Sequence, residues 1–546
     1  MTAQTTDRPA ASAPPSARFA NLLRAEWTKF RSVRGWVIGM IVAAIVTVLL
    51  GVFAAGSANI GCGSGPGGGV QLTGKACLPR IPLGPGGEAV DDSFYFVHQP
   101  LAGNGTITVR VTSLTGRHSD GNGPVPAGTA GGGTPSPGAN MVPGLVGWAK
   151  AGIMIKASTR QGAAYAAMMV TGSHGVRMQY DFTQDTAGLA GSVTAVSPRW
   201  LRLTRSGDTI TGYDSADGRH WSVVGIARLS GLPSTVQSGV FATSPQYLKV
   251  ASFFGGASIQ SGASVATGVF DDFRLQGNWP AGRWTGSALG GGSRGDYPDA
   301  GGDWQHGAGQ LTVTGSGDIA PAVPGPGGGF PSSTIEQSLV GMFAGLIAIV
   351  VVAALFVTTE YRRGLIRLTL AASPRRGRVL AAKAIIAGAV AFVVGLAAAI
   401  VCVAIGVPRQ RNEGMYILPV SALTDARVLV GTALMVALAA VLAVAVGAIF
   451  RRSAAAVTTA IVVVVLPFLL SVTVLPNGVA NWVLRLTPAA GFAIEQSIPH
   501  YAQVSTVYSA AGGQYPLPPW AGLGVLCAYT AAALAIAVAA LRRRDA

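Results

Sequence analysis

The sequence predicts a six-span α-helical membrane protein that carries a large all-β domain between its first two spans. Charged residues make up 11% of the 546 positions and hydrophobic residues 49%, a balance that a single soluble domain does not show. The long apolar runs lie toward the two ends of the chain. The stretch 57–335 is instead rich in Gly, Ser and Thr and alternates in short segments, which is typical of strands.

Six stretches are long and apolar enough to cross about 30 Å of hydrocarbon, which takes roughly 20 residues. None contains Asp, Glu, Lys or Arg, and a charge at the bilayer centre costs roughly 2.5 to 3.5 kcal/mol on insertion scales. Pro467 lies inside the fifth stretch, where it predicts a kink. The predicted spans are 35–55, 337–359, then three within 384–475 (384–407, 428–450 and 453–475), and 520–541.

Basic residues predict the orientation of these spans. With both termini inside, the inner segments collect 18 Lys and Arg, whereas the short outer loops hold four, namely Arg409, Arg411, Arg427 and Arg485. Cytosolic loops carry such an excess, and long domains translocate largely regardless of charge. We therefore expect a multi-pass protein of the cell membrane with cytoplasmic N- and C-termini and with residues 57–335 extracytoplasmic.

The segments outside the spans have distinct compositions. Residues 1–17, rich in Ala, Pro, Ser and Thr, predict a disordered cytosolic tail, and residues 542–546 a basic cytosolic tail. Residues 476–519 form an outer loop, in which 482–494 is apolar enough to dip into the outer leaflet. Residues 18–34 predict an amphipathic interfacial helix on the inner membrane surface. Its residues at helical spacing are Phe19, Leu22, Leu23, Glu26, Trp27 and Phe30, with basic residues among them.

The segment 57–335 predicts a β-sandwich with Gly-rich linkers. Alternating residues and Gly-containing turns are the basis of this prediction. The expected elements are a strand at 106–111, a hairpin of 200–203 with 209–213, a second hairpin turning at 217–218, a strand within 307–318 that pairs back near 94–97, and linkers at 121–144 and 315–329.

Four cysteines divide into two groups. Cys402 and Cys527 lie inside apolar runs and are expected to be packing residues. Cys62 and Cys77 lie just beyond the first span, in a stretch that would face an oxidising exterior. Two alternatives stay open for this pair, a disulfide that contributes roughly 3 kcal/mol to local order and two free thiols.

The predicted outer domain resembles the concanavalin-type or laminin-G-like jelly roll. The resemblance covers roughly residues 90–276 and rests on 151–155, on the strand 200–203, on the 217–218 hairpin with Trp221, and on the closing 270–273. It implies a jelly-roll fold and a glycan or cell-envelope ligand.

Hydrolysis is not expected of this domain. A retaining glycosidase needs two carboxyl groups about 5 to 5.5 Å apart, but the segment holds one glutamate, Glu88, and the adjacent Asp271 and Asp272 would face opposite sides of a strand. The histidines show no metal-ligand spacing, so we expect no metal or other cofactor. They are His98, His118, His174, His220 and His306.

One apparent phosphate-binding motif is a chance match. Gly69 to Lys75 has the spacing of a P-loop, but Ala76 follows where a Ser or Thr should hold magnesium, and no helical run comes after. We therefore expect no ATPase in this chain and no enzymatic activity of its own.

Residues 360–383, between the second and third spans, combine an acid at the membrane edge with a cluster of basic residues. This segment resembles the cytosolic loop of the type-two ABC exporter permeases, as do the amphipathic helix, Phe450 to Ser453 and the short basic tail. The residues that carry the loop's resemblance are Glu360, Tyr361, Arg362, Arg363, Gly364, Arg367, Pro374, Arg375 and Arg376.

The resemblance implies an export permease without an ATPase of its own. A separately encoded ATPase dimer, which binds ATP and magnesium, would dock beneath two permease subunits, either two copies or a copy and a relative. Glu360 and the arginines after it would form or support a coupling helix that fits a groove on the ATPase. The large outer domain departs from the compact pattern of this family.

A surface lectin or sensor anchored in the membrane is the alternative function, although one helix would suffice for anchoring. A basic surface for nucleic acid does not fit, because the excess of positive charge lies at the ends of apolar runs and residues 57–335 carry a net charge of only +2.

Overall fold

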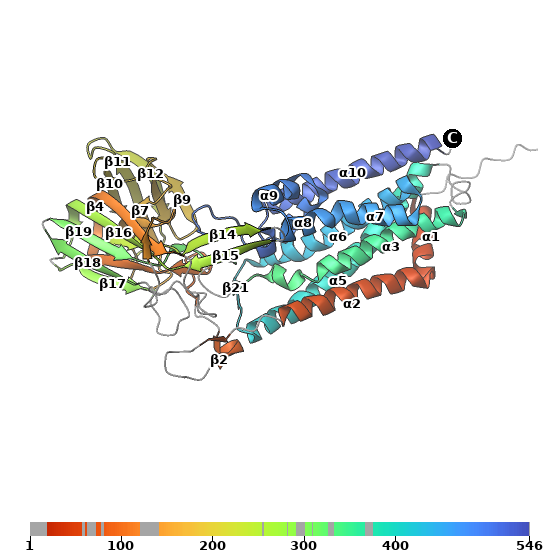
Figure 1. Cartoon of the computed structure of the whole chain (residues 1–546), viewed down its shortest axis with the longest axis horizontal. Coiled ribbons are helices and arrows are strands. Elements are labelled where there is room, and N and C mark those ends of the chain that lie inside the picture. The colour runs from red at the N-terminus through yellow and green to blue at the C-terminus, as the bar shows by residue number, and fades with distance from the viewer. Residues whose placement is uncertain are drawn as a thin grey trace, which may run out of the picture.

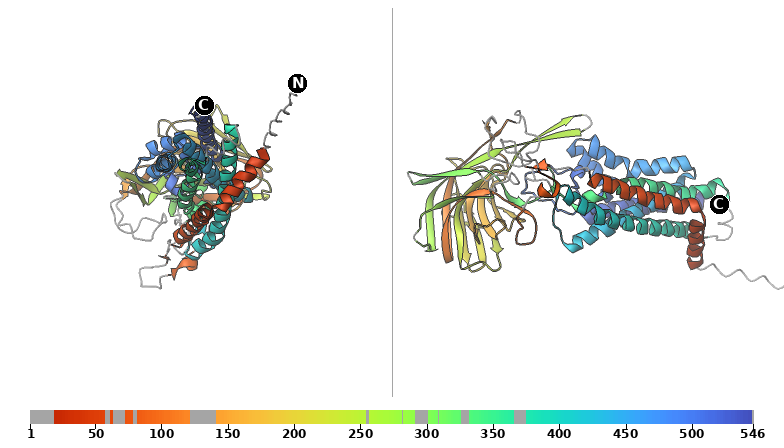
Figure 2. Two further views of the ribbon diagram at one scale, coloured as in Figure 1. Left: turned by 90° about the vertical axis from the view of Figure 1, so that its right-hand side faces the viewer. Right: turned by 90° about the horizontal axis from the view of Figure 1, so that it is seen from below.

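The chain folds into a helical bundle with a large β domain at one end (Figures 1 and 2). The computed structural model describes residues 19–56, 61–62, 72–77, 81–120, 141–253, 256–280, 282–290, 301–307, 309–325, 332–365 and 375–544. The predicted tail 1–17 lies outside these residues. We name the two ends of the bundle the β-domain end and the α1 end, after the element that lies at each (Figure 1).

Five helices of the bundle are long and apolar enough to cross a membrane, and a bent pair makes six if it counts as one span. The protein is therefore a multi-pass membrane protein. The five are α2 (Arg34–Ala55), α3 (Met342–Arg362), α5 (Arg376–Asn412), α6 (Ala422–Phe450) and α10 (Pro519–Arg544), and the bent pair is α7 (Ser453–Val464) with α8 (Leu466–Thr473).

The bend between α7 and α8, of 40°, falls where the sequence predicts a kink. Pro467 lies in the first turn of α8, where its missing N–H costs least. Further along, the Ser471 hydroxyl donates to the Pro467 carbonyl oxygen at 2.7 Å.

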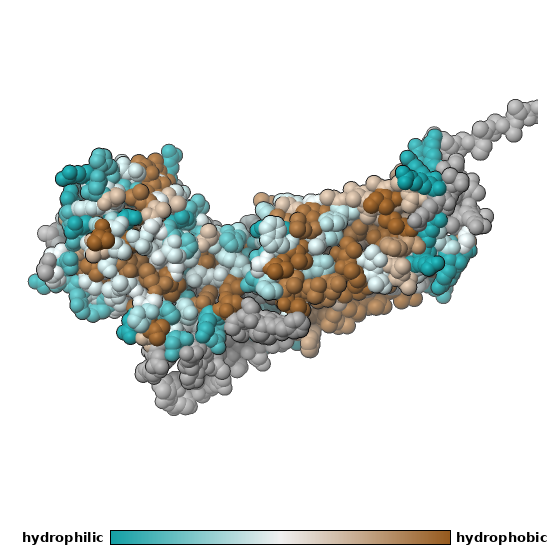
Figure 3. Space-filling model, turned by 45° about the horizontal axis from the view of Figure 1, so that its top comes forward, coloured by the Kyte–Doolittle hydropathy of each residue, from teal (hydrophilic) through white to brown (hydrophobic). Residues whose placement is uncertain are grey.

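Helix α6 lies at the centre of the bundle. In its most apolar window 67% of the residues are buried, against 22% in α2. Its buried residues include Ala439, Ala440 and Ala443, small side chains that let neighbouring helices approach closely. The outer helix α2 instead exposes large apolar side chains, such as Ile45 and Phe53, that lipid would cover. Figure 3 shows apolar surface along the helices, with hydrophilic residues at the α1 end and on much of the β domain.

The β domain is built around the long strand β4 (Phe94–Ser119). The main sheet runs β12-β11-β10-β4-β13-β6-β7-β8-β9, and β5, β16 and β17 also pair with β4. Two further sheets of two strands each are β14–β15 and β20–β3. Besides β4, the strands of the domain are β3 (Val90–Asp92), β5 (Met141–Pro143), β6 (Lys150–Lys156), β7 (Tyr165–Thr171), β8 (Val176–Tyr180), β9 (Gln184–Ala187), β10 (Arg199–Ser206), β11 (Thr209–Ser215), β12 (Ser222–Arg228), β13 (Thr235–Thr243), β14 (Tyr247–Phe253), β15 (Gly256–Gly262), β16 (Ser264–Asn278), β17 (Thr285–Leu289), β18 (Gly302–Gly307), β19 (Gln310–Gly315) and β20 (Ile319–Pro321).

The predicted hairpins at 206–208 and 217–218 are present as the antiparallel pairs β10–β11 and β11–β12. The predicted pairing of 307–318 with 94–97 is wrong. Strand β19 in that segment pairs with β16 and β18, and β17 is the strand that pairs with residues 94–98. The structure shows a large β-sheet domain, as expected.

Both faces of the central strands are buried. Residues Val97, Ile107 and Val109 of β4 belong to the main core, whereas Phe94 and Phe96 point into a second, smaller core that includes Tyr165. The second core also surrounds the ammonium group of Lys156, which forms an ion pair with Asp92 of β3 at 2.7 Å. A matching pair joins Lys150 to Asp318 beside β20 at 2.5 Å. These two ion pairs fix the short strands β3 and β20 against β6.

The β domain is seated on the bundle through apolar side chains. Ala320 and Val323 of the domain share a cluster with Leu418 from the α5–α6 loop and with Ile498 and Val504 from the loop after η3 (Pro488–Glu495). A parallel bridge between β21 (Ser332–Ser333) and β22 (Tyr416–Ile417) lies beside it. The Gln503 amide also donates to the carbonyl oxygens of Phe182 and Thr183.

Other short elements complete the chain. The amphipathic segment forms α1 (Phe19–Ser32), and α9 (Asn477–Leu486) precedes η3. Strands β1 (Gly61–Cys62) and β2 (Leu72–Thr73) pair ahead of η1 (Gly74–Cys77), but the side chains of Cys62 and Cys77 lie outside the described residues. The remaining elements are η2 (Ile335–Leu339) and η4 (Ala510–Gly512).

Candidate functional site

A cluster of four charged side chains joins three elements at the α1 end. Lys383 of α5 contacts Glu26 of α1 and Glu360 of α3, with Nζ–O distances of 2.6 Å to each carboxylate. Lys29 lies 2.8 Å from Glu26 and 3.5 Å from Glu360. We call Glu26, Lys29, Glu360 and Lys383 the charge cluster.

The charge cluster is shielded from solvent on one side and open on the other. The side chains of Lys383 and Glu26 are each 2% exposed and that of Glu360 is 11% exposed, whereas Lys29 is 40% exposed. The Phe356 ring lies 4.9 Å from the Lys383 ammonium group and adds a cation–π contact. Two acids and two lysines give no net charge, and their mutual attraction offsets the free energy lost when these groups leave water.

The local sequence explains how α1 reaches the cluster. On one side of α1, Glu26 and Phe30 lie one turn apart and are buried, whereas Trp27 is 45% exposed. Phe30 packs edge-on against Phe356 at 5.5 Å. The predicted amphipathic helix is therefore present, and its inward side carries a carboxylate as well as apolar groups.

Glu360 also borders a cavity. Its second oxygen, Oε2, has no hydrogen-bond partner among the described residues. A cavity of about 300 Å³ lies beside it, lined by Lys29, Trp36, Arg363 and others. The carboxylate thus has one oxygen committed to the lysines and one available to a further donor.

The predicted coupling residues flank a segment that the structure does not describe. Glu360, Tyr361 and Arg362 end α3, Arg363 and Gly364 follow, and Arg375 and Arg376 begin α5. Arg367 and Pro374 lie outside the described residues. The coupling role of all these residues stays a prediction.

The residues that flank this loop differ in exposure and in their contacts. Arg362 and Arg363 are exposed, and Gly364 adopts a left-handed conformation with φ of +69° that turns the chain away from α3. Tyr361 instead lies under the Arg451 guanidinium at 5.2 Å. Arg376 donates to the Leu541 carbonyl oxygen at 2.9 Å, which joins the start of α5 to the end of α10.

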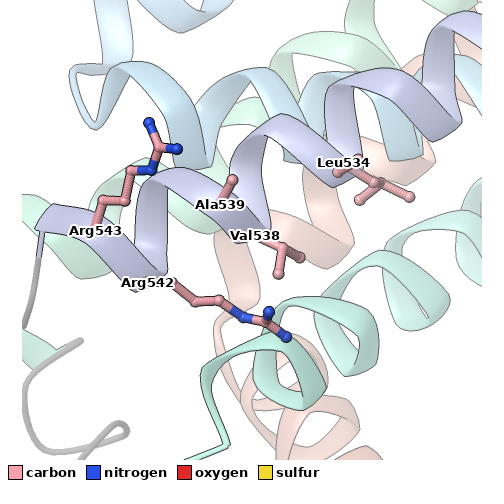
Figure 4. A pocket seen from close by; sticks show the side chains of 6 residues that line it. Leu534, Val538, Ala539, Arg542 and Arg543 are labelled. Atoms are coloured by element: carbon pink, nitrogen blue, oxygen red, sulfur yellow. The ribbon is translucent and has the colours of Figure 1, made fainter.

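The end of α10 carries an open apolar groove of about 470 Å³ (Figure 4). Leu534, Val538 and Ala539 line it, and Arg542 and Arg543 project in different directions at its end. Apolar residues followed by arginines are typical of a helix that leaves the membrane at this level.

Sequence reasoning missed the partners of Glu360. The sequence pattern places Lys383 in the basic loop 360–383 and Glu26 in the interfacial helix 18–34. The sequence does contain a signal that Lys383 belongs to a helix. Lys383 lies seven residues, or two helical turns, after Arg376, and the helix starts before the apolar run. The sequence alone does not show that residues 26, 360 and 383 contact one another.

Comparisons with known proteins identify the family. A family model described as "ABC-2 family transporter protein" matches residues 164–546, which is more than half of the chain. No curated protein matches.

Several solved structures are similar to parts of the chain. A functionally unknown protein from Saccharomyces cerevisiae has 15% identity, covering 38% of this chain and 85% of its own, with a TM-score of 0.21. Scytalido-glutamic peptidase with a transition state analog inhibitor has 9% identity, covering 41% and 98%, with a TM-score of 0.24. Peanut lectin with a 9mer peptide has 10% identity, covering 46% and 82%, with a TM-score of 0.13. Scores this low carry no argument about fold or function.

The family match includes the bundle from α3 to α10 and therefore the loop flanks and two members of the charge cluster. Several membrane-spanning helices agree with it. The chain belongs to the ABC-2 family of transporter membrane proteins.

Proposed function

We propose that this chain is the permease subunit of an ATP-driven exporter, energised by a separately encoded ATPase that binds at the α1 end. The observation that carries the proposal is the charge cluster. Lys383 joins the two helices that flank the predicted coupling loop to the amphipathic helix α1. A push on the loop would therefore move α1, α3 and α5 as one unit.

The proposed orientation follows from charge. The predicted inner segments hold 18 basic residues against four in the short outer loops, so the α1 end would face the cytosol and the β domain the exterior. Exposed Arg362 and Arg363 would then be available to acidic groups of the ATPase. Contacts of this kind set the register of an interface more than its affinity.

In this proposal the buried part of the loop and its exposed part have different roles. Glu360 is a positioning residue, because Lys383 donates to its Oε1 and joins it to α1 and α5. ATP and magnesium would bind to the partner ATPase, beneath two permease subunits. Those subunits are either two copies of this chain or this chain and a relative.

The β domain would act as an external receptor, substrate-handling or cell-envelope-binding module with a jelly-roll-like topology. Its apolar seat on the α5–α6 loop supports a role in the transport cycle, because motion at the ends of the helices would reach the domain directly. A sensor tethered for anchoring would not need this contact.

The test measures ATP turnover in liposomes that hold the ATPase with or without this chain. We expect the wild-type chain to raise turnover and Glu360→Ala to abolish the increase while membrane insertion is retained. Glu413→Ala is the matched control, because Glu413 caps the opposite end of α5. Unchanged turnover with the wild-type chain would count against the exporter. Purification without any ATPase, together with tight glycan binding, would favour the lectin or sensor.

A further inference from the structure

Two buried carboxyl groups at the β-domain end of the bundle lie near enough to interact electrostatically. Glu336 belongs to η2, just before α3, and Glu495 ends η3. Their residues are 6% and 9% exposed. The Ser497 backbone N–H, two residues after Glu495, donates to Glu336 Oε1 at 3.3 Å. Both groups lie outside the spanning helices.

Glycines bring η3 into this position. A Cβ at Gly431 of α6 would collide with the Ile494 side chain, and one at Gly522 of α10 would collide with the Ala490 carbonyl oxygen. The segment 482–494, predicted to enter the outer leaflet, therefore ends as η3 between α6 and α10. A Cβ at Gly513 would lie 3.1 Å from Glu336 Oε1, so the backbone there closes over the carboxyl group.

The charges around the pair do not balance. Among the residues that the structure describes, Arg427 of α6 faces the pair, and its guanidinium donates to the carbonyl oxygens of Ile494 and Gln496 at 3.1 and 2.6 Å. Tyr515 is the other titratable group that faces it. Neighbouring α5 ends in Arg409 and Arg411, whose side chains are exposed. Two ionised carboxylates and one guanidinium would leave a buried charge of minus one.

Unpaired polar atoms lie in the same place. Glu336 Oε2, Glu495 Oε1 and the Gln514 amide nitrogen are buried and have no hydrogen-bond partner in the described part of the chain. An unpaired buried charge and an unpaired buried polar atom both destabilise the folded chain. One added cation would remove the net charge and supply a missing partner.

We propose that Glu336 and Glu495 form a proton-binding site that holds one proton on the pair while η3 is seated. When one carboxyl group takes up the proton, an O–H bond forms, that group becomes neutral, and the buried charge of minus one is removed. When η3 leaves its seat and water enters, the O–H bond breaks, the electron pair stays on the carboxylate and the proton passes to water. The proposed ligand is a proton, and the structure of the site links its release to opening of the β-domain end.

The electrostatics of the site agree with this assignment. Burial, which outweighs the opposing effect of the Thr432 hydroxyl, raises the pKa of Glu495 to about 8, and the negative charge of Glu336 contributes to this rise. Burial also raises the pKa of Glu336 above its usual value. The folded chain therefore holds protons that the unfolded chain has released at the same pH.

The sign of the pH dependence follows from this difference. Because the folded pKa of Glu495 lies near 8 and the ordinary value is 4.5, the stabilising effect of the proton is complete below the ordinary value. It is lost as the pH rises toward the folded pKa, and the folding equilibrium weakens by up to tenfold per pH unit in that window. Above about pH 8 the proton no longer stabilises the folded chain.

The experiment is thermal unfolding of the full-length protein in detergent between pH 5.5 and 9. We expect the wild-type Tm to fall with rising pH, Glu495→Gln to flatten this slope, and Glu413→Gln to keep it. Infrared spectroscopy at pH 7 should show a protonated carboxyl band that Glu495→Gln removes and Glu336→Gln alters. The measurement needs no ATPase, so failure of the exporter proposal would leave it intact.

Three outcomes would overturn the proposal. One is an unchanged slope in Glu495→Gln. Another is the absence of the infrared band in the wild-type protein, which decides the question even if the variants fail to fold. The third is a saturable rise in Tm with sodium but not with choline at fixed pH, which would identify a metal cation as the occupant.

Discussion

Replacing Lys383 with methionine is expected to destabilise the bundle by about 3 to 5 kcal/mol, because two buried carboxylates, Glu26 and Glu360, then share only the partly exposed Lys29 as a cation. Both carboxylates accept from the same ammonium group at 2.6 Å. The loss should appear as a lower Tm in detergent and as faster proteolysis within α1, which would no longer be held to α3 and α5.

Lys29→Met provides the matched control for Lys383→Met. Lys29 contacts the same two acids, but its side chain is 40% exposed, so its removal should cost no more than about 1 kcal/mol. Equal losses in the two variants would show that burial at Lys383 does not decide the stability of the cluster.

A neutral version of the cluster separates stability from coupling. The triple variant Glu26→Gln, Glu360→Gln, Lys383→Met removes every buried charge, and such replacements are often neutral for stability. We expect a Tm near that of the wild type and weak stimulation of the ATPase. Full stimulation by this variant would remove the charge cluster from the mechanism.

Gly522→Ala should have the second large effect, with a cost of about 1 to 3 kcal/mol. Its Cβ would lie closer to the Ala490 carbonyl oxygen than van der Waals contact allows, and the nearby Ala493 Cβ would be 2.7 Å away. Because these neighbours belong to η3, either η3 or α10 has to shift. The measurement is the Tm in detergent, with cross-linking between η3 and α10 as a second readout.

Gly524→Ala is the control on the same helix. A Cβ at Gly524 meets nothing within 4 Å, so alanine should be neutral or stabilise α10 by about 0.5 to 1 kcal/mol through its better helix propensity. A loss of stability in this variant comparable with that of Gly522→Ala would show that the packing of η3 is not the cause.

The helices of the bundle could be placed from the sequence because the bilayer imposes a length and excludes charge. Their ends could not. Helix α5 begins at Arg376 rather than near 384, since the charged residues from 376 to 383 continue the helix beyond the apolar run. Helix α3 begins at Met342 rather than 337, because η2 occupies the preceding residues.

The parts of the site that sequence reasoning could not reach depend on contacts between distant residues. The sequence shows that Glu360 is an acid at a membrane edge, but its partners come from positions 26 and 383. Strand pairing failed for the same reason at 307–318, since any of several alternating segments could lie beside β4. Local patterns specify elements, whereas partners follow from the packing of the whole chain.

The seat of the β domain gives the permease a mechanical property. The domain contacts the α5–α6 loop and the loop after η3 through apolar side chains, and the β21–β22 bridge lies beside this contact. These contacts connect the domain rigidly to the bundle, whereas a flexible linker would let it move independently. Force applied to the β domain would therefore reach the ends of the helices through these contacts. In the proposed exporter, a mechanical load on the domain would change the rate of transport.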